Sequence, residues 1–235
     1  MKRKLSLLLI VFITICFVNN NVAYGFCENV TKNNKIIYLT FDDGPSITTN
    51  RILDILKQYN VKATFFLIGN QIKGNENVVR RIKNEGHSIG LHSYTHKYDR
   101  IYSSKKVFIK EMHDTCDEIN RVTGISPNII RFPGGSKDHL DNEMLYLLHK
   151  CNYKIYDWNV DSSDGINPKA SPNTLFEKAT NPKIKPVRII LLMHCGYMQK
   201  NTCKALPEII NFYKSKGYKF KVISENTTEF YCHCK

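Results

Sequence analysis

Residues 35–45 read KIIYLTFDDGP, an apolar run that ends in two adjacent aspartates and a Gly-Pro turn. The apolar run Lys35–Phe41 predicts a β-strand. Gly44 and Pro45 turn the chain directly after Asp42 and Asp43. We expect the two carboxylates to point to different sides where they leave the strand. An acidic turn without a chemical role is the alternative, because Asp, Gly and Pro are all favoured in turns.

Strand-like and helical patterns alternate along the rest of the chain. Strands are predicted at 63–68, 88–91, 129–131, 154–158, 187–193 and 219–223, and helices at 49–58, 77–84, 104–122, 141–152 and 204–216. A polar stretch rich in Asn, Ser and Pro occupies 159–173, and no element is predicted there. This alternation predicts one α/β domain with a mostly parallel sheet wrapped by helices.

Candidate functional side chains lie at or just past the carboxyl ends of separate predicted strands. They are Asp42, Asp43, His92, Arg131, Trp158 and His194. In a barrel these strand ends converge on one face, whereas an open sheet spreads them along a line. The placement therefore favours a (β/α) barrel over an open doubly wound sheet.

Two histidines and an aspartate offer ligands for a divalent metal. His92 and His96 are four residues apart, which places both imidazoles on one side of a helical turn. With one of the two aspartates they leave open positions for water and substrate. The second aspartate is then a spare carboxylate beside the metal, the apparatus of a hydrolase. Two unrelated histidines in a polar loop are the alternative.

His194 ends the apolar run 187–193, where an ionisable group is costly unless it is paired. A carboxylate partner would raise its pKa and make it a proton donor near neutral pH. A histidine bonded to backbone is the alternative. Arg131 precedes Phe132-Pro133-Gly134-Gly135. Proline restricts the backbone and the two glycines have no side chains, so a substrate can approach this backbone closely. An ordinary loop with a surface arginine is the alternative there.

Residues 1–25 have the features of a secretory signal peptide. A basic start, Lys2-Arg3-Lys4, precedes an apolar run, Leu5–Val18, and a small-x-small end, Ala23-Tyr24-Gly25. The run is short for a membrane span, and an uncleaved anchor is the alternative. No other stretch is apolar enough to span a bilayer, so we expect no stable membrane insertion after cleavage.

The chain carries a formal charge of +13, and removing the three basic residues of residues 1–25, which hold no acid, leaves +10. A basic exported protein suits an anionic surface such as a cell wall. A solvated basic surface with no specific partner is equally consistent. No nucleic-acid partner is expected, because no helix-turn-helix, zinc-finger or aromatic RNA-binding motif is present.

Seven of the eight cysteines lie outside the predicted signal peptide, so at least one stays free or pairs between chains. Cys116 and Cys151 are expected to be small core residues. Pairing is open among Cys27, Cys195, Cys203, Cys232 and Cys234. Cys195 and Cys203 could close a short loop, and Cys27 could join Cys232 or Cys234.

The motifs together resemble those of the polysaccharide deacetylase (NodB-homology) family, carbohydrate esterase family 4. The resemblance covers about residues 35–223 and includes all five family motifs in order. It implies a distorted (β/α) barrel, often with seven strands, in a domain at 35–224. An N-terminal extension at 26–34 would precede the domain, and a C-terminal tail at 225–235 would follow it.

The resemblance also implies a role for each motif residue. Asp42 matches the catalytic base, and Arg131 matches the arginine that holds it. The metal ligands would be Asp43, His92 and His96. One divalent ion is implied, with Zn²⁺ expected and Co²⁺ or Mn²⁺ able to substitute.

The remaining motifs supply the acid and the substrate-binding groups. His194 matches the general acid, and Asp164 matches the aspartate that orients it. Leu192 matches the leucine that lines the acetyl pocket, and Gly134 would give its backbone N–H to the oxyanion. The family often has an aromatic residue at the Gly134 position and Trp at the Gly165 position. The resemblance leaves Trp158, the only Trp, to supply the missing wall.

The resemblance implies hydrolysis of N-acetyl groups from an N-acetylglucosamine-containing polysaccharide, with release of acetate. Together with the predicted export, the resemblance implies cell-wall peptidoglycan as the substrate, and a secreted, wall-associated monomer is the expected state. Chitin oligomers, muramic-acid residues and acetylated xylan are the alternative substrates. A wall-binding pseudoenzyme is the non-catalytic alternative, and the complete set of motif residues argues against it.

Overall fold

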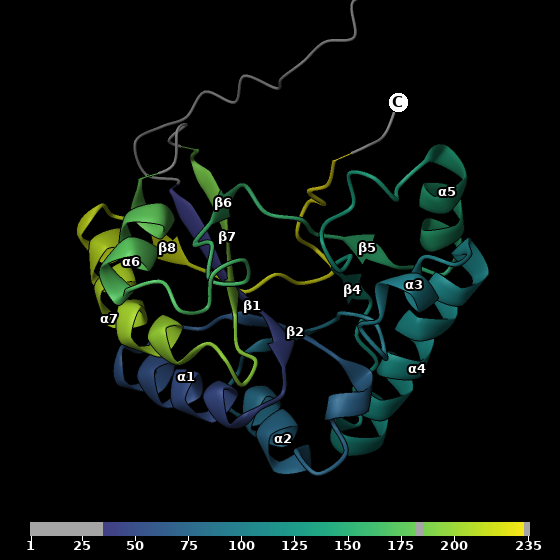
Figure 1. The fold of residues 1–235 in the computed structure, drawn as a ribbon, viewed down its shortest axis with the longest axis horizontal. Coiled ribbons are helices and arrows are strands. Elements are labelled where there is room, and N and C mark those ends of the chain that lie inside the picture. The colour runs from purple at the N-terminus through teal and green to yellow at the C-terminus, as the bar shows by residue number, and fades with distance from the viewer. Residues whose placement is uncertain (1–34, 182–185, 233–235) are drawn as a thin grey trace, which may run out of the picture. The chain divides into compact units, whose positions relative to one another are not determined.

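Eight parallel strands form one sheet in the computed structural model, which describes residues 35–181 and 186–232 (Figure 1). They are β1 (Ile36–Gly44), β2 (Thr64–Leu67), β3 (Ser88–Leu91), β4 (Ile129–Ile130), β5 (Lys154–Ile155), β6 (Val160–Asp161), β7 (Arg188–His194) and β8 (Lys219–Phe220). Seven strands follow the order β5-β4-β3-β2-β1-β7-β6, and β8 pairs with the amino end of β1. The predicted parallel α/β fold is confirmed.

Helices cover the outside of the curled sheet (Figure 1). They are α1 (Ile47–Gln58), α2 (Glu76–Asn84), α3 (Tyr98–Ile101), α4 (Lys105–Thr123), α5 (Asn142–Lys150), α6 (Pro172–Thr180) and α7 (Lys200–Ser215), with a 3₁₀ turn η1 (Gly69–Gln71). Ser104 caps the start of α4, and Gly124 ends it at φ 72°. Strand β6 and the start of α6 lie in the polar stretch 159–173, where neither was predicted.

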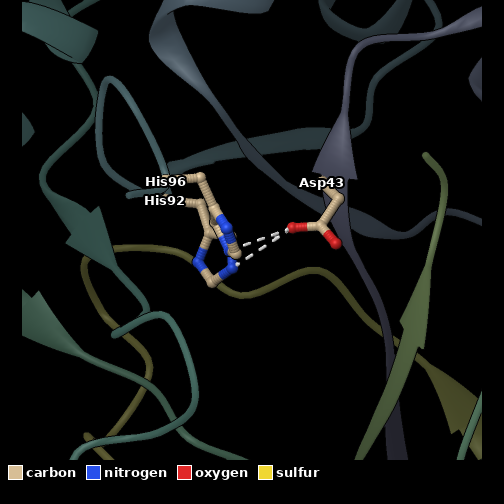
Figure 2. Close-up of side chains that lie close together, drawn as sticks. All are labelled: Asp43, His92 and His96. Carbon is tan, nitrogen blue, oxygen red and sulfur yellow. Dashed lines mark ion pairs between the residues drawn. The ribbon is translucent and has the colours of Figure 1, made fainter. Parts of the chain in front are cut away.

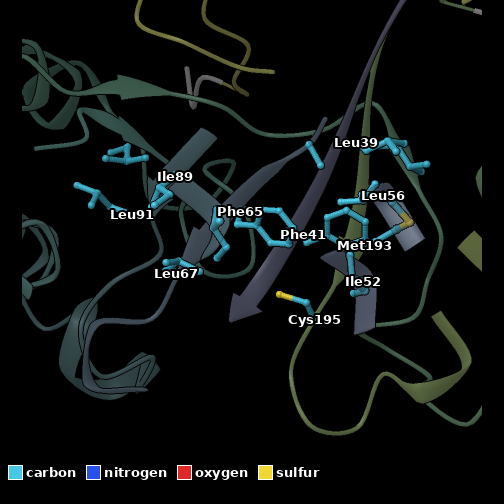
Figure 3. Close-up of a cluster of buried hydrophobic side chains, with 14 of the residues drawn as sticks. Leu39, Phe41, Ile52, Leu56, Phe65, Leu67, Ile89, Leu91, Met193 and Cys195 are labelled. Carbon is cyan, nitrogen blue, oxygen red and sulfur yellow. The ribbon is translucent and has the colours of Figure 1, made fainter. Parts of the chain in front are cut away.

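Successive side chains of a strand point to opposite faces of the sheet, so the sheet has an outer core on one face and an inner core on the other. On β1, Ile37, Leu39 and Phe41 face the helices and belong to the larger core, part of which Figure 3 shows. Tyr38 faces the other side and joins a smaller core. The other members of this inner core are Phe66, Ile129, Tyr156, Ile190 and Ile223. Thr40 and Asp42 continue the inner face of β1, so the alternation alone carries Asp42 toward the inside.

The seven-strand path curls around this inner core, and the fold is a distorted (β/α) barrel in a single domain (Figure 1). Strands β5 and β6 end the path, and they are not paired with each other in the described residues. Tyr156, which follows β5, pairs with Phe230 instead. The barrel is therefore open between its two end strands.

The described part of the predicted tail is built into the domain. Ile155 N–H donates to Glu229 Oε1 at 2.8 Å, Phe230 N–H to Ile155 O at 3.2 Å, and Asp157 N–H to Phe230 O at 2.6 Å. Cys232 N–H donates to the buried carboxylate of Asp157 at 3.0 Å. This segment covers the free edge of β5, which would otherwise expose unpaired backbone groups.

One of the open cysteine pairings is excluded, and one cysteine prediction is wrong. Cys195 is fully buried and its thiol donates to Asp42 O at 3.2 Å, while the thiol of Cys203 lies near Thr48 O, so these two cysteines form no disulfide. Cys151 is exposed, because α5 ends at Lys150 and does not continue its buried face. Cys116 packs against the outer core as predicted. Cys27 and Cys234 lie outside the described residues.

No helix within residues 35–181 and 186–232 has the length and apolar character needed to cross a membrane. The predicted signal peptide and the extension at 26–34 lie outside the described residues.

Candidate active site

A pocket of about 310 Å³ opens at the carboxyl ends of the strands, next to the inner core. Its lining consists of Asp42, Asp43, His92, His96, Tyr98, Gly134, Trp158, Asp161, Gly165, Ile166, Leu192 and His194. Every site residue named from the sequence is in this lining except Arg131 and Asp164. Those two residues lie behind the lining: Arg131 donates to Asp42, and Asp164 pairs with His194.

Asp43, His92 and His96 form a three-ligand cluster (Figure 2). Asp43 Oδ1 lies 3.6 Å from His92 Nε2 and 3.3 Å from His96 Nε2. This buried oxygen has no hydrogen-bond partner among the described residues. Ligands about 2.0–2.2 Å from a tetrahedral ion lie roughly 3.3–3.5 Å apart, close to these separations. The donor set therefore fits a divalent metal.

His92 is prepared as a neutral ligand. Its Nδ1 lies 2.9 Å from Arg131 O and donates to that carbonyl, which leaves the Nε2 lone pair for the site. Burial lowers the pKa of His92, and this outweighs the effect of the neighbouring aspartates. The same backbone carbonyl thus sets both the tautomer and the orientation of the ring.

The two histidines do not share a helical turn, so that part of the prediction is wrong. They lie in an irregular loop after β3, in which Ser93 and His96 have φ values of 64° and 54°. The buried carboxylate of Glu111, on α4, holds this loop. It accepts hydrogen bonds from Tyr94 N–H at 3.0 Å and from Thr95 N–H at 2.7 Å.

Sequence reasoning missed Glu111, although a signal was present. Glu111 lies on the same helical face as Phe108, Met112 and Ile119, which are all buried. An acid on an otherwise apolar face must find partners, because burying an unpaired charge is costly. Its partners are Arg100 Nε, at 2.6 Å, and the N–H groups of the loop 92–97, which holds His92 and His96 and is called the metal-ligand loop below.

Asp42 and Asp43 both face the pocket, so the expectation that they point to different sides is wrong. Asp43 has φ 66°, and the pairing of β1 with β2 shifts register between Phe41 and Gly44. This irregularity breaks the strand alternation and turns both carboxylates inward. Asp42 Oδ2 lies 3.7 Å from His92 Nε2.

Arg131 is fully buried in the inner core and fixes Asp42. Its guanidinium donates to Asp42 Oδ1 at 2.9 Å and to Thr40 Oγ1 at 2.7 Å. It also donates to Tyr156 O at 2.8 Å and to Asp157 O at 3.1 Å. Arg131 is therefore a buried residue of the site and not a surface arginine. Its hydrogen bond to Oδ1 of Asp42 leaves Oδ2 facing the pocket.

His194 is paired with the carboxylate that the sequence indicates. Its Nδ1 lies 2.7 Å from Asp164 Oδ1. The second oxygen of Asp164 accepts from the backbone N–H of His194 at 2.8 Å and from the Thr202 hydroxyl at 2.7 Å. Burial alone would lower the pKa of His194. The hydrogen bond and charge of Asp164, with the more distant Asp42 and Asp43, outweigh burial and raise that pKa to about 9.

The turn at Gly134-Gly135 is lined by two aromatic rings from elsewhere in the chain. A Cβ on Gly134 would lie 2.9 Å from the hydroxyl oxygen of Tyr98, and one on Gly135 would lie 3.1 Å from the Trp158 ring. Both glycines have positive φ, 79° and 92°. Tyr98 therefore stands next to the side-chain position that Gly134 leaves empty, a contact that sequence reasoning missed.

Gly165 has a packing role beside His194. A Cβ there would lie 2.3 Å from His194 Cε1, so the glycine makes room for the His194 ring. Trp158 lines the pocket as predicted, but it packs beside Gly135. Asp161, in the same segment, also lines the pocket, and burial raises its pKa.

Comparison with known proteins gives concordant matches. A family model described as polysaccharide deacetylase matches residues 29–156. A peptidoglycan-N-acetylglucosamine deacetylase of Bacillus cereus is 35% identical over 200 residues, covering 83% of this chain and 72% of that protein. The peptidoglycan-N-acetylmuramic acid deacetylase PdaC of Bacillus subtilis is 33% identical over 202 residues, 84% of this chain and 40% of that protein. A crystal structure of a Bacillus cereus polysaccharide deacetylase matches with a TM-score of 0.76 and 33% identity, over 83% of this chain and 94% of that one.

Proposed function

Because the chain belongs to the polysaccharide deacetylase family of hydrolases, we propose that it removes N-acetyl groups from N-acetylglucosamine units of peptidoglycan and releases acetate. The observation that carries the reaction type is the arrangement in one pocket of Asp42, the three-ligand cluster and the His194–Asp164 pair. A spare carboxylate, a metal-ligand set and a paired imidazole together supply the groups that amide hydrolysis requires.

Asp43, His92 and His96 would hold one divalent metal, for which we propose Zn²⁺, with Co²⁺ or Mn²⁺ as substitutes. When bound, such an ion lowers the pKa of a water molecule and polarises the carbonyl of the acetyl group. The lowered pKa of His92, which favours the neutral imidazole, and the Asp43 oxygen that lacks a hydrogen-bond partner in the described residues support this assignment, because both atoms can act as ligands.

Asp42 would act as the general base. Arg131 binds Oδ1, so Oδ2 faces the pocket and can take the proton from the attacking water. The Gly134 N–H would donate to the oxyanion that forms on the acetyl carbonyl. Leu192, buried in the pocket wall, would contact the acetyl methyl group.

His194 would act as the general acid. Asp164 occupies Nδ1, which leaves Nε2 to protonate the departing amine. The raised pKa of His194 keeps the imidazole protonated near neutral pH, and an amine is a poor leaving group without that proton. The products are acetate and a free amino sugar.

Three considerations support a cell-wall polysaccharide such as peptidoglycan as the substrate. The Bacillus cereus relative is a peptidoglycan-N-acetylglucosamine deacetylase. The basic composition and the signal-like residues 1–25 suit a secreted, wall-associated protein. Tyr98 and Trp158 offer aromatic surface against which a sugar ring can pack.

Acetate release tests the proposal directly. The purified protein should release acetate from peptidoglycan faster than from chitin oligomers or acetylated xylan. A chelator should stop the release, and Zn²⁺ should restore it. His92→Ala should lose both metal and activity, whereas His113→Ala, an exposed histidine on α4, should keep both. Binding to peptidoglycan without acetate release would favour the non-catalytic alternative, and faster release from another polymer would change the substrate.

A further inference from the structure

The short helix α3 connects the metal-ligand loop to α4 and brings two tyrosines to the Gly134 turn. Tyr98 begins α3, and Tyr102 follows its last residue. The Tyr102 hydroxyl donates a hydrogen bond to Pro133 O at 2.6 Å. Pro133 O belongs to the same peptide group as the Gly134 N–H, so this hydrogen bond acts on the group that the proposed function assigns to the oxyanion.

The geometry of a peptide group links the two atoms. In a trans peptide the carbonyl and the N–H point in opposite directions within one plane. A donor that holds Pro133 O on one side therefore directs the Gly134 N–H to the other side. Gly134 lines the pocket, and its N–H donates to no acceptor within the described residues.

This turn has few other restraints on its orientation. Gly134 and Gly135 both have positive φ and lack a side chain that could anchor the peptide. One backbone hydrogen bond closes the turn, from Gly135 N–H to Phe132 O at 2.9 Å. An external anchor is therefore needed to keep the Pro133–Gly134 peptide in one orientation.

Tyr102 is itself held rigidly. Its ring stacks on His139, with centroids 3.4 Å apart and planes within 6°, and it also stacks on Phe108 at 5.8 Å. Burial raises the pKa of Tyr102, so the hydroxyl stays protonated and remains a donor. Aromatic contacts and one strong hydrogen bond thus connect α3 to the glycine turn.

We propose that Tyr102 is a positioning residue that orients the Pro133–Gly134 peptide, so that the Gly134 N–H stabilises the oxyanion of the deacetylation reaction. The proposal rests on the proposed function of this pocket. Tyr102 touches neither the substrate nor the metal ligands in this role. It acts only through the peptide group to which it donates.

The test is Tyr102→Phe, which removes the hydroxyl and keeps the stacked ring. The matched control is Tyr213→Phe, because Tyr213 is another buried tyrosine whose hydroxyl donates to a backbone carbonyl, Ala179 O, away from the pocket. Both variants are compared with wild type for kcat, KM, metal content and Tm. Peptidoglycan and 4-nitrophenyl acetate are the two substrates, the second being a small acetate ester that uses the same oxyanion site but makes no sugar contacts.

We expect Tyr102→Phe to lower kcat about tenfold or more on both substrates, since losing an oxyanion donor entirely costs about 10²–10³. KM and metal content should stay unchanged. Tyr213→Phe should lower Tm to a similar extent and keep kcat. A kcat within twofold of wild type in Tyr102→Phe, or an equal kcat loss in both variants, overturns the proposal.

The two substrates separate this inference from the proposed function. If wild type hydrolyses only the ester, the peptidoglycan assignment fails and Tyr102 is still tested on the ester. If wild type hydrolyses neither, both proposals fall. Should Tyr102→Phe not fold, His139→Ala takes its place, because it frees the Tyr102 ring and keeps the hydroxyl. A partial loss of kcat then supports the proposal, and an unchanged kcat contradicts it.

Discussion

Asp42 and Asp43 are adjacent and share one pocket, yet their partners differ. Asp42 is buried and held by Arg131, whereas Asp43 Oδ1 meets the two imidazoles and has no hydrogen-bond partner in the described part of the chain. We predict that Asp42→Asn lowers turnover at least about 10²-fold and keeps the metal content, because it removes the proposed general base but none of the three proposed metal ligands. Asp43→Asn should instead reduce the metal content.

Elemental analysis and acetate release, measured on both variants, decide between the roles. Metal loss in Asp42→Asn with metal retained in Asp43→Asn would exchange the two assignments. Full activity of Asp42→Asn would rule out its role as base.

The His194–Asp164 pair predicts how activity depends on pH. His194 donates a proton only below its pKa, which Asp164 helps to raise to about 9, so activity should fall as pH rises through that region. Asp164→Asn removes the negative charge, and an opposite charge at this distance shifts a pKa by about 1–3 units. The alkaline limb should then move to lower pH by about one unit or more, and the maximal rate should fall.

Thr202→Val is the control, because it removes a hydrogen bond to Asp164 but leaves the charge. Its alkaline limb should move much less. An alkaline limb that stays in place in Asp164→Asn would show that another group is the acid.

At the scale of elements, α4 supports the metal-ligand loop through one buried side chain. Glu111 accepts hydrogen bonds from two loop N–H groups and from Thr95 Oγ1. We predict that Glu111→Gln weakens metal binding about 10- to 100-fold, the usual cost of losing an outer-shell partner. Metal titration of the metal-free protein measures this effect.

Glu118→Gln on the same helix is the matched control. Glu118 forms a partly exposed pair with Arg121, and such surface pairs contribute little. Its metal affinity should therefore equal that of wild type. If both variants bind metal equally well, the loop does not depend on Glu111.

At the scale of the whole domain, the C-terminal segment 229–232 joins β5 to the surroundings of Arg131. Asp157 connects them, since its N–H donates to Phe230 O, its carboxylate accepts from Cys232 N–H, and its carbonyl accepts from Arg131. We predict that a chain ending at Thr228 has a Tm lower by about 5 °C or more. Several hydrogen bonds of about 1 kcal/mol each are lost, and each kcal/mol shifts Tm by about 2–4 °C at this size.

The truncated chain should also lose kcat, because the Asp157 carbonyl that holds Arg131 becomes less constrained. Thermal unfolding and acetate release measure the two effects. Thr228→Ala is the control, because Thr228 is exposed and its backbone carbonyl, which the substitution keeps, accepts the hydrogen bond from Arg188. An unchanged Tm in the truncated chain would mean that the segment is not part of the domain's stable structure.

The sequence by itself determined the fold class and most of the residues that line the pocket. The alternation on β1 places Ile37, Leu39 and Phe41 against the helices, and it places Tyr38 and Asp42 on the inner face. Burial of one strand face is a local property of the pattern, so it can be predicted without tertiary contacts. The family resemblance then identified Arg131 and Asp164 as the partners of Asp42 and His194, and the structure places them there.

Only the tertiary structure decided how these residues meet. His92 and His96 converge through a loop with positive φ angles, which Glu111 holds from a different element, and not through a helical turn. Tyr102 reaches Pro133 O across 31 residues, and Cys232 reaches Asp157 across 75. Such contacts depend on the packing of whole elements, because the entropy of closing these loops is overcome only when the sheet and helices assemble together.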